Sequence, residues 1–193
     1  MADTGAAGSG SFGPSALATP ANAITVFRLL TTPLMVVLIA RAGPSWSAVA
    51  AWFVLSCTDG LDGYLARRQG TTRSGAFLDP LADKICVLAA MGALVAVGRW
   101  WWPPVALIAA RELIQTGLRY RLGRRGISIP ATQWAKVKTW LQDMSVGAAL
   151  LPWLAPHHAF VQAILWTAVV LTVVTGAQYL ADSRHAAPAH VPA

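Results

Sequence analysis

The sequence predicts an all-α integral membrane protein with six transmembrane helices, and composition and segment length are the observations behind this prediction. The chain has 193 residues, of which 55% are hydrophobic and only 12% are charged, and its mean hydropathy is +0.52. Soluble domains usually carry charge on roughly a quarter of their residues. About 20 consecutive apolar residues suffice to cross a bilayer as a helix, and six such stretches can be traced along this chain.

The six hydrophobic segments are separated by breaks that contain Gly or Pro, which are the strongest interruptions of helical patterns. The predicted helices cover residues 24–42, 47–68, 79–98, 103–124, 133–154 and 159–181. Residues 1–20 consist mostly of Gly, Ala, Ser, Thr and Pro, so we expect a flexible arm there. The membrane domain is then expected over residues 21–182, followed by a flexible tail over 183–193.

Basic residues predict how the chain is oriented. They concentrate in two of the connections between segments. The second connection contains Arg67, Arg68 and Arg73, and the fourth contains Arg121, Arg124 and Arg125. Because cytoplasmic loops are enriched in Lys and Arg, we expect a multi-pass protein of the cell membrane with both termini in the cytoplasm. This bias also accounts for the net charge of +7, so nucleic acid is not an expected partner. The other connections lie near the tryptophans expected in an interfacial belt: Trp46, Trp100, Trp101, Trp102 and Trp153.

Most of the acidic residues lie in or beside the hydrophobic segments: Asp59, Asp62, Asp79, Asp83, Glu112 and Asp143. A carboxylate at the bilayer centre costs roughly 2.5–3.5 kcal/mol on insertion scales, so such groups usually face protein, water or a cation and have a function. Glu112 and Asp143 have Arg111 and Lys136 within reach as partners, so ion pairs that lock helices together explain these two acids equally well.

The four aspartates have a spacing that favours a metal site. Asp59 and Asp62 are three positions apart in the second segment, while Asp79 and Asp83 are four apart in the third. Residues at these spacings share one helix face, and the short connector makes the two helices antiparallel neighbours. We therefore expect four carboxylates to converge in a pocket open to the cytoplasm. All-oxygen ligands favour Mg²⁺ or Mn²⁺, and two metal ions suit in-line displacement at phosphorus.

The same residues form a longer motif. From Asp59 to Asp83 the chain matches D-x2-D-G-x2-A-R-x7-G-x3-D-x3-D at every fixed position, and Asn22, Thr25 and Arg28 fit N-x2-T-x2-R before it. The motif resembles that of the CDP-alcohol phosphatidyltransferase family. The resemblance implies transfer of a phosphatidyl group from CDP-diacylglycerol to an alcohol, with release of CMP. It also implies a homodimer.

The resemblance further implies roles for individual residues. The four aspartates would hold two Mg²⁺ or Mn²⁺ ions, and Asp83 would also act as the catalytic base that takes the proton of the acceptor hydroxyl. The residues implied to bind the CDP-diacylglycerol donor are Asn22, Thr25, Gly63, Ala66, Arg67, Arg73 and Gly75.

Basic residues in the fourth and fifth segments bear on the acceptor. The residues expected to bind an acceptor phosphate are Arg111, Arg119, Lys136 and Lys138. Their surroundings resemble A-R-E…L-R and G-K-x-K-T stretches in the glycerol-phosphate branch of the family, although Ala135 replaces the Gly. Cations beside a pyrophosphate donor indicate an acceptor that carries its own phosphate, and glycerol 3-phosphate fits. Topology signals or contacts with anionic lipid are the other explanation of these cations.

Three other functions stay open on the sequence alone. Family members with inositol phosphate as acceptor would keep the cationic pocket, whereas those that use phosphatidylglycerol to make cardiolipin would need a site more open to lipid. A divalent-cation or proton transporter also carries acids within the membrane. A transporter would place those acids near the midplane with access from both sides, but here they lie at one end of two adjacent segments.

Overall fold

The computed structural model describes residues 20–69, 75–123 and 133–185, and the regular elements in these ranges are all helical. Within them, side chains are described for residues 23–58, 81–123 and 133–183. The elements are α1 (Pro20–Ala42), α2 (Trp46–Gln69), α3 (Gly75–Ala96), α4 (Trp102–Gly123), α5 (Gln133–Leu150), the 3₁₀ turn η1 (Pro152–Leu154) and α6 (His158–His185). The prediction of an all-α chain with six long helices is confirmed.

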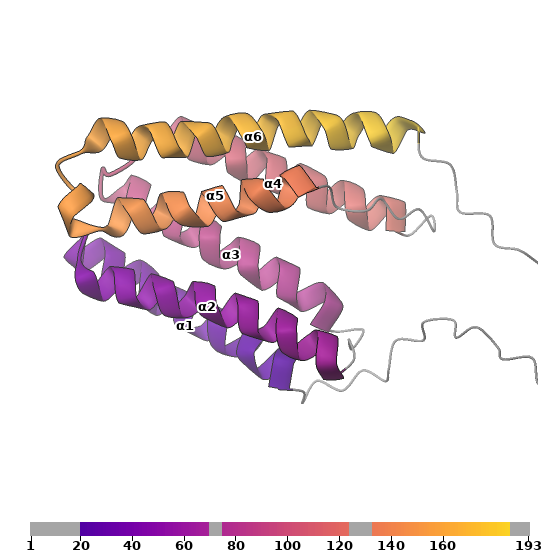
Figure 1. The fold of residues 1–193 in the computed structure, drawn as a ribbon, viewed down its shortest axis with the longest axis horizontal. Coiled ribbons are helices and arrows are strands. Elements are labelled where there is room, and N and C mark those ends of the chain that lie inside the picture. Colours follow the sequence, from indigo (N-terminus) through magenta and orange to yellow (C-terminus); the bar gives the residue numbers. More distant parts are fainter. Residues whose placement is uncertain (1–19, 70–74, 124–132, 186–193) are drawn as a thin grey trace, which may run out of the picture.

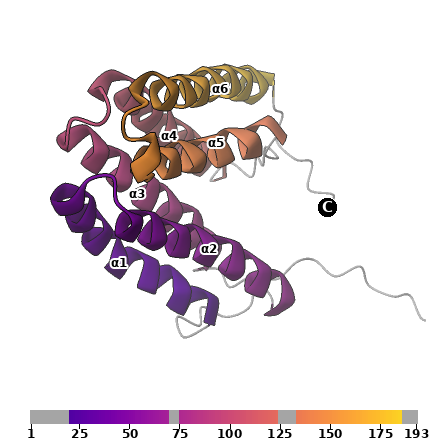
Figure 2. The same cartoon turned by 60° about the vertical axis from the view of Figure 1, so that its left-hand side comes forward.

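The helices run alternately up and down in two groups of three (Figures 1 and 2). In the first group α1 packs against both α2 and α3, and in the second α6 packs against both α4 and α5. The beginning of α1 and the end of α6 lie at the same end of the bundle (Figure 1). We call this the terminal end, and the end with the connections after α1, α3 and α5 the far end.

The predicted boundaries hold to within a few residues, and the differences have local causes. Helix α1 begins at Pro20, because proline is well suited to the first position of a helix. The fifth helix stops at Leu150 instead of reaching residue 154, and η1 follows with Pro152 at its start. Gly43 and Gly98, which follow α1 and α3, have φ values of +58° and +69°. Glycine adopts such angles without steric cost, so both helices end there.

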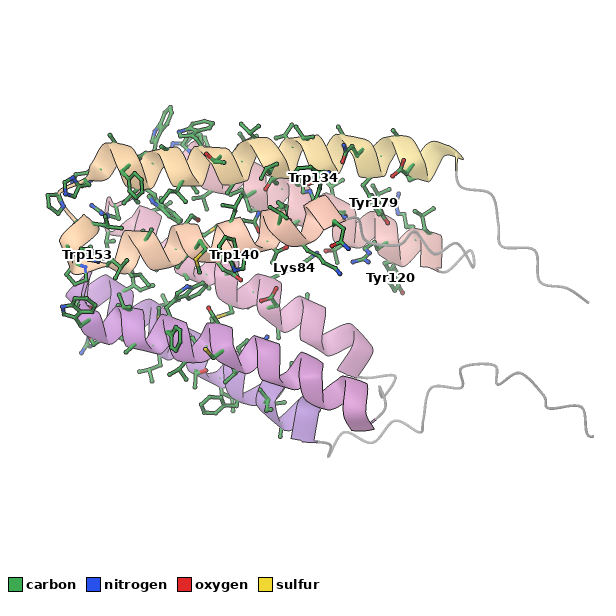
Figure 3. All side chains as sticks on the ribbon, viewed as in Figure 1. Lys84, Tyr120, Trp134, Trp140, Trp153 and Tyr179 are labelled. Carbon is green, nitrogen blue, oxygen red and sulfur yellow. The ribbon has the colours of Figure 1, made fainter. Side chains whose placement is uncertain are left out.

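The apolar core lies toward the far end. Its members come from the late residues of α1, α3 and α5 and from the early residues of α2, α4 and α6. Among them are Met35, Ile39, Trp52, Met91, Leu94, Ile108, Leu150 and Leu165. Trp46, Trp101, Trp102 and Trp153 are exposed at this end, and Figure 3 shows Trp153 there. Trp100 differs from the expected belt because it is only 3% exposed and packs in the core.

The outer surface of the bundle is apolar along much of its length. Exposed side chains include Leu30, Leu34, Leu113 and Val170. Among the described residues, Ala23–Ala42 and His158–Ser183 are long and apolar enough to cross a membrane. The other four helices are not among these candidate spans. Helices α4 and α5 carry more charged residues, and the side chains of α2 and α3 are described over only part of their length. Exposed apolar surface of this kind is typical of contact with lipid or with another protein.

A buried arginine joins two connections at the far end of the bundle by hydrogen bonds. Arg99, in the connection between α3 and α4, donates hydrogen bonds to the carbonyl oxygens of Ala155 (2.6 Å), Leu154 (2.8 Å) and Ala149 (3.3 Å). Its Nη1 also lies 3.1 Å from Nδ1 of His158. These contacts tie the connection after α3 to the connection after α5. Arg99 therefore stabilises the junction between the two groups of helices at this end.

We expect Arg99→Ala to lower the free energy of unfolding by about 2 kcal/mol or more, because hydrogen bonds to charged groups are the stronger ones and their loss leaves buried carbonyls unpaired. Thermal melting of the purified protein in detergent, followed by tryptophan fluorescence, measures the effect. Arg41→Ala is the matched control, because Arg41 is an exposed arginine at the end of α1. Equal melting temperatures for the two variants would contradict the assignment.

Candidate functional site

A pocket of about 430 Å³ lies between α3, α4, α5 and α6. Its basic lining residues are Lys84, Arg111, Arg119, Lys136 and Lys138, and its acidic ones are Glu112, Asp143 and Asp182. The structure thus brings together all four cations that the sequence assigned to the acceptor phosphate, although they come from two different helices. We call this cavity the cation pocket.

Glu112 lies at the centre of the inner cations. It is 5% exposed, and its Oε1 accepts hydrogen bonds from Nη1 of Arg111 at 2.8 Å and from Nζ of Lys138. Its Oε2 lies 3.2 Å from Nζ of Lys84. A buried charge is costly unless it is paired and hydrogen-bonded. One carboxylate therefore holds three cations from α3, α4 and α5 in place. An ion pair with Arg111, one of the explanations that the sequence left open for Glu112, is present.

The orientation of Arg111 depends on α6. Adjacent residues of a helix do not normally face each other, yet the Arg111 guanidinium folds back to Glu112. Its Nη2 donates to Oγ1 of Thr175 at 3.1 Å. A Cβ atom at Gly176 would lie 3.2 Å from both Cγ and Nε of Arg111. The absence of a side chain at Gly176 thus gives the arginine room to cross from α4 to α6.

The basic side chains of the cation pocket differ in how exposed they are to solvent. Lys138 is 4% exposed and forms an ion pair with Glu112. Arg119 and Lys136 are exposed near the terminal ends of α4 and α5. The inner cations are therefore structurally paired, and the outer ones can bind a ligand from solution. Arginine offers a planar fork of donors and lysine a compact charge, and both suit a phosphate group.

Asp83 lies beside the cation pocket. It is partly buried on α3 and lines a small cavity of about 30 Å³ together with Lys84, Glu112 and Lys138. A second cavity of about 10 Å³ is lined by Asp83, Arg28 of α1 and Asp143 of α5, among others. Asp83 is thus placed between the pocket and the buried start of α1, where Thr25 and Arg28 are almost inaccessible.

The remaining predicted site residues can be placed only by their position in the helices. Asp59, Asp62, Gly63, Ala66 and Arg67 belong to the last turns of α2, Gly75 and Asp79 to the first turns of α3, and Asn22 to the start of α1. These segments all lie at the terminal end (Figure 1). The lining of the cation pocket includes Arg119, Lys136 and Asp182, which are near the same end. The side chains lie outside the described residues, and Arg73 lies wholly outside them.

A metal centre cannot be assembled from the described side chains alone. They contain no group of three or more His, Cys, Asp or Glu residues that could hold a metal ion. Three of the four predicted ligands, namely Asp59, Asp62 and Asp79, are not among them. Asp83, the fourth, supplies the oxygen ligands that Mg²⁺ and Mn²⁺ prefer. The described part of the site therefore fits such an ion but does not contain the whole ligand set.

Lys84 is the residue of the pocket that the sequence analysis missed. It directly follows Asp83 in a long apolar segment, and its side chain lies between α3 and α4 (Figure 3). Its Nζ pairs with Glu112 and donates to Oγ1 of Thr116 at 2.7 Å. The available signal was its position, since a lone lysine inside an apolar helix usually has a buried partner or a function.

A helical bundle with an aspartate beside a pocket of cations fits an enzyme that acts on phosphorylated substrates. The profile of the CDP-alcohol phosphatidyltransferase family matches residues 18–174, from the residues before α1 to well inside α6. The chain therefore belongs to this family and is a transferase of that class.

The chain is also similar to curated relatives over most of their length. It is 39% identical over 175 residues to the probable phosphatidylglycerophosphate synthase of Mycobacterium tuberculosis, covering 88% of this chain and 83% of the relative. The proteins of Escherichia coli K12 and Haemophilus influenzae named CDP-diacylglycerol–glycerol-3-phosphate 3-phosphatidyltransferase are 39% and 36% identical. These matches cover 83% and 81% of this chain and 92% and 89% of the relatives.

Replacing the central carboxylate should destabilise the protein. We expect Glu112→Gln to lower the free energy of unfolding by about 3 kcal/mol or more, because the loss of one partner of a buried ion pair leaves uncompensated charge. Thermal melting in detergent measures the change. Asp182→Asn is the matched control, since Asp182 lines the same pocket but is exposed. The central role of Glu112 is wrong if both variants melt at the same temperature.

Proposed function

We propose that this protein transfers the phosphatidyl group of CDP-diacylglycerol to sn-glycerol 3-phosphate, giving phosphatidylglycerophosphate and CMP. The single observation that carries the proposal is the position of the cation pocket directly beside Asp83. The names of the relatives from Escherichia coli and Haemophilus influenzae, which specify this donor and this acceptor, support it.

The acceptor is proposed from the chemistry of the pocket. Arg119 and Lys136 are exposed and would bind the phosphate of glycerol 3-phosphate, with Arg111 and Lys138 behind them. The hydroxyl to be phosphatidylated would then reach toward Asp83, which shares a small cavity with Lys138. Glycerol without a phosphate would offer no anion to Arg119 and Lys136. Charge complementarity therefore selects a phosphorylated alcohol over a neutral one.

The donor is assigned to the first group of helices. Asp59, Asp62, Asp79 and Asp83 would hold two Mg²⁺ or Mn²⁺ ions, which supply positive charge to the phosphate oxygens and a template for in-line displacement. Asn22, Thr25, Gly63, Ala66, Arg67, Arg73 and Gly75 would bind the cytidine and pyrophosphate. Except for Arg73, these residues belong to α1, α2 or α3. Their position at the terminal end, next to the cation pocket, supports this assignment.

The proposed reaction needs one proton transfer, from the acceptor hydroxyl to the protein. The acceptor hydroxyl oxygen attacks the phosphorus that carries the diacylglycerol, and the Asp83 carboxylate takes the hydroxyl proton. The bond from that phosphorus to the bridging oxygen breaks, and the electron pair leaves with CMP. Positioning and electrostatic stabilisation of the phosphate oxygens supply most of the rate in such transfers, which agrees with a site made of fixed charges.

The lipid donor explains the architecture that we propose. The bundle would lie in the cell membrane with six transmembrane helices, and the terminal end would face the cytoplasm, where the soluble acceptor is available. The apolar outer surface supports this placement. Basic residues support it too, namely Arg121 in the last turn of α4 and Arg124 and Arg125, which follow α4 in the sequence. The acyl chains would stay in the bilayer while the head group enters the polar site. A homodimer is proposed from the family resemblance.

The direct test is CMP release by purified protein supplied with CDP-diacylglycerol, Mg²⁺ or Mn²⁺, and each candidate acceptor separately. We expect turnover with glycerol 3-phosphate, little with inositol phosphate or phosphatidylglycerol, and none for Asp83→Asn, which should still bind CDP-diacylglycerol. Faster CMP release with inositol phosphate or phosphatidylglycerol would reassign the acceptor. Unchanged turnover by Asp83→Asn would remove the assignment of Asp83 as base.

A further inference from the structure

The proposed substrates bind to different groups of helices. Asp83 and the other predicted metal ligands belong to α2 and α3, whereas Arg111, Arg119, Lys136 and Lys138 belong to α4 and α5. Helix α3 packs mainly on α1 and makes fewer contacts with α4 and α5. The reaction requires the acceptor hydroxyl and the donor phosphorus to meet across this junction. The relative position of the two groups at the terminal end is therefore decisive for the rate.

Lys84 crosses that junction next to the reacting centre. It leaves α3 directly after Asp83 and reaches α4, where Nζ lies 3.2 Å from Oε2 of Glu112 and 2.7 Å from Oγ1 of Thr116. The Thr116 hydroxyl in turn donates to the main-chain oxygen of Glu112 at 2.7 Å. Lys84 thus binds two points on one turn of α4 and links α3 to α4 at this level.

Charge neutralisation alone does not account for Lys84. The other carboxylate oxygen of Glu112 already accepts hydrogen bonds from Arg111 and Lys138, so the buried acid is paired without Lys84. The side chain of Lys84 is 25% exposed, compared with 4% for Lys138. It also lines both the cation pocket and the small cavity at Asp83. Glu112 and Lys138 line both cavities as well, but Lys84 comes from α3, directly after Asp83.

We propose that Lys84 is a positioning residue for the transfer reaction, which holds Asp83 on α3 in register with the cation pocket through Glu112 and Thr116 on α4. This inference rests on the proposed function. Displacing a reacting group by about 1 Å can lower a rate by about a hundredfold. Loss of the Lys84 contacts should therefore slow the chemical step, with much less effect on the binding of either substrate.

The test measures kcat and the KM for each substrate in Lys84→Met, Lys84→Arg and Thr116→Val, with Arg41→Met as a control that removes a distant exposed cation. We expect kcat of Lys84→Met to fall about tenfold or more while the donor KM stays within about twofold. Lys84→Arg should recover part of the loss, because arginine can still reach an acid. Thr116→Val should lower kcat less, because Lys84 keeps its contact with Glu112.

The outcomes separate the two proposals. If wild-type protein releases no CMP with any acceptor, the proposed function fails, and this inference fails with it. If wild-type protein is active but Lys84→Met and Thr116→Val keep its kcat, only the positioning role is wrong. A higher acceptor KM with unchanged kcat would make Lys84 a simple phosphate ligand and would also overturn the proposal. Melting temperatures of each variant show whether it is folded, and Thr116→Val provides the test if Lys84→Met is not.

Discussion

The described part of the site depends on one buried carboxylate. Glu112 pairs with Lys84, Arg111 and Lys138, which come from α3, α4 and α5. Without it, three cations would face one another in a largely buried region, and like charges at such range repel strongly where water is scarce. With it, inner cations are fixed while Arg119 and Lys136 stay accessible. The proposed phosphorylated acceptor would then meet a positive, preorganised pocket, and preorganised charge is the largest contribution to many enzymatic rates.

The ion pairs around Glu112 lie at one end of the bundle, and the apolar core lies at the other. The far end contains the apolar core and is closed by Arg99, whose hydrogen bonds join the connections after α3 and α5. The terminal end contains the polar site, where the helices are joined by ion pairs such as Lys84–Glu112. A rigid core at one end and a charged site at the other suit a lipid transferase, because the head group must enter protein while the acyl chains stay in the bilayer.

Much of this arrangement could be predicted from the sequence. Apolar segments with Gly or Pro breaks gave six helices, and the aspartate spacing placed Asp83 at the terminal end. The four cations that the sequence assigned to the acceptor phosphate were chosen one by one and line one pocket. Lys84 was missed because single-sequence reasoning gives helix faces but not which helices pack together. Trp100 was misplaced for a similar reason, since burial at a connection depends on tertiary packing. The Glu112 network required knowledge of how α3, α4 and α5 approach one another.

The central claim is that the cation pocket binds the phosphate of the acceptor. Calorimetric titration of glycerol 3-phosphate into the purified protein, without CDP-diacylglycerol or metal ion, tests it most directly. We expect saturable binding by wild-type protein, weaker by about tenfold in Arg119→Ala because a charge-assisted hydrogen bond is lost, and no measurable binding of glycerol. Equal affinity for glycerol, or an Arg119→Ala variant that binds as tightly as wild type, would contradict the account.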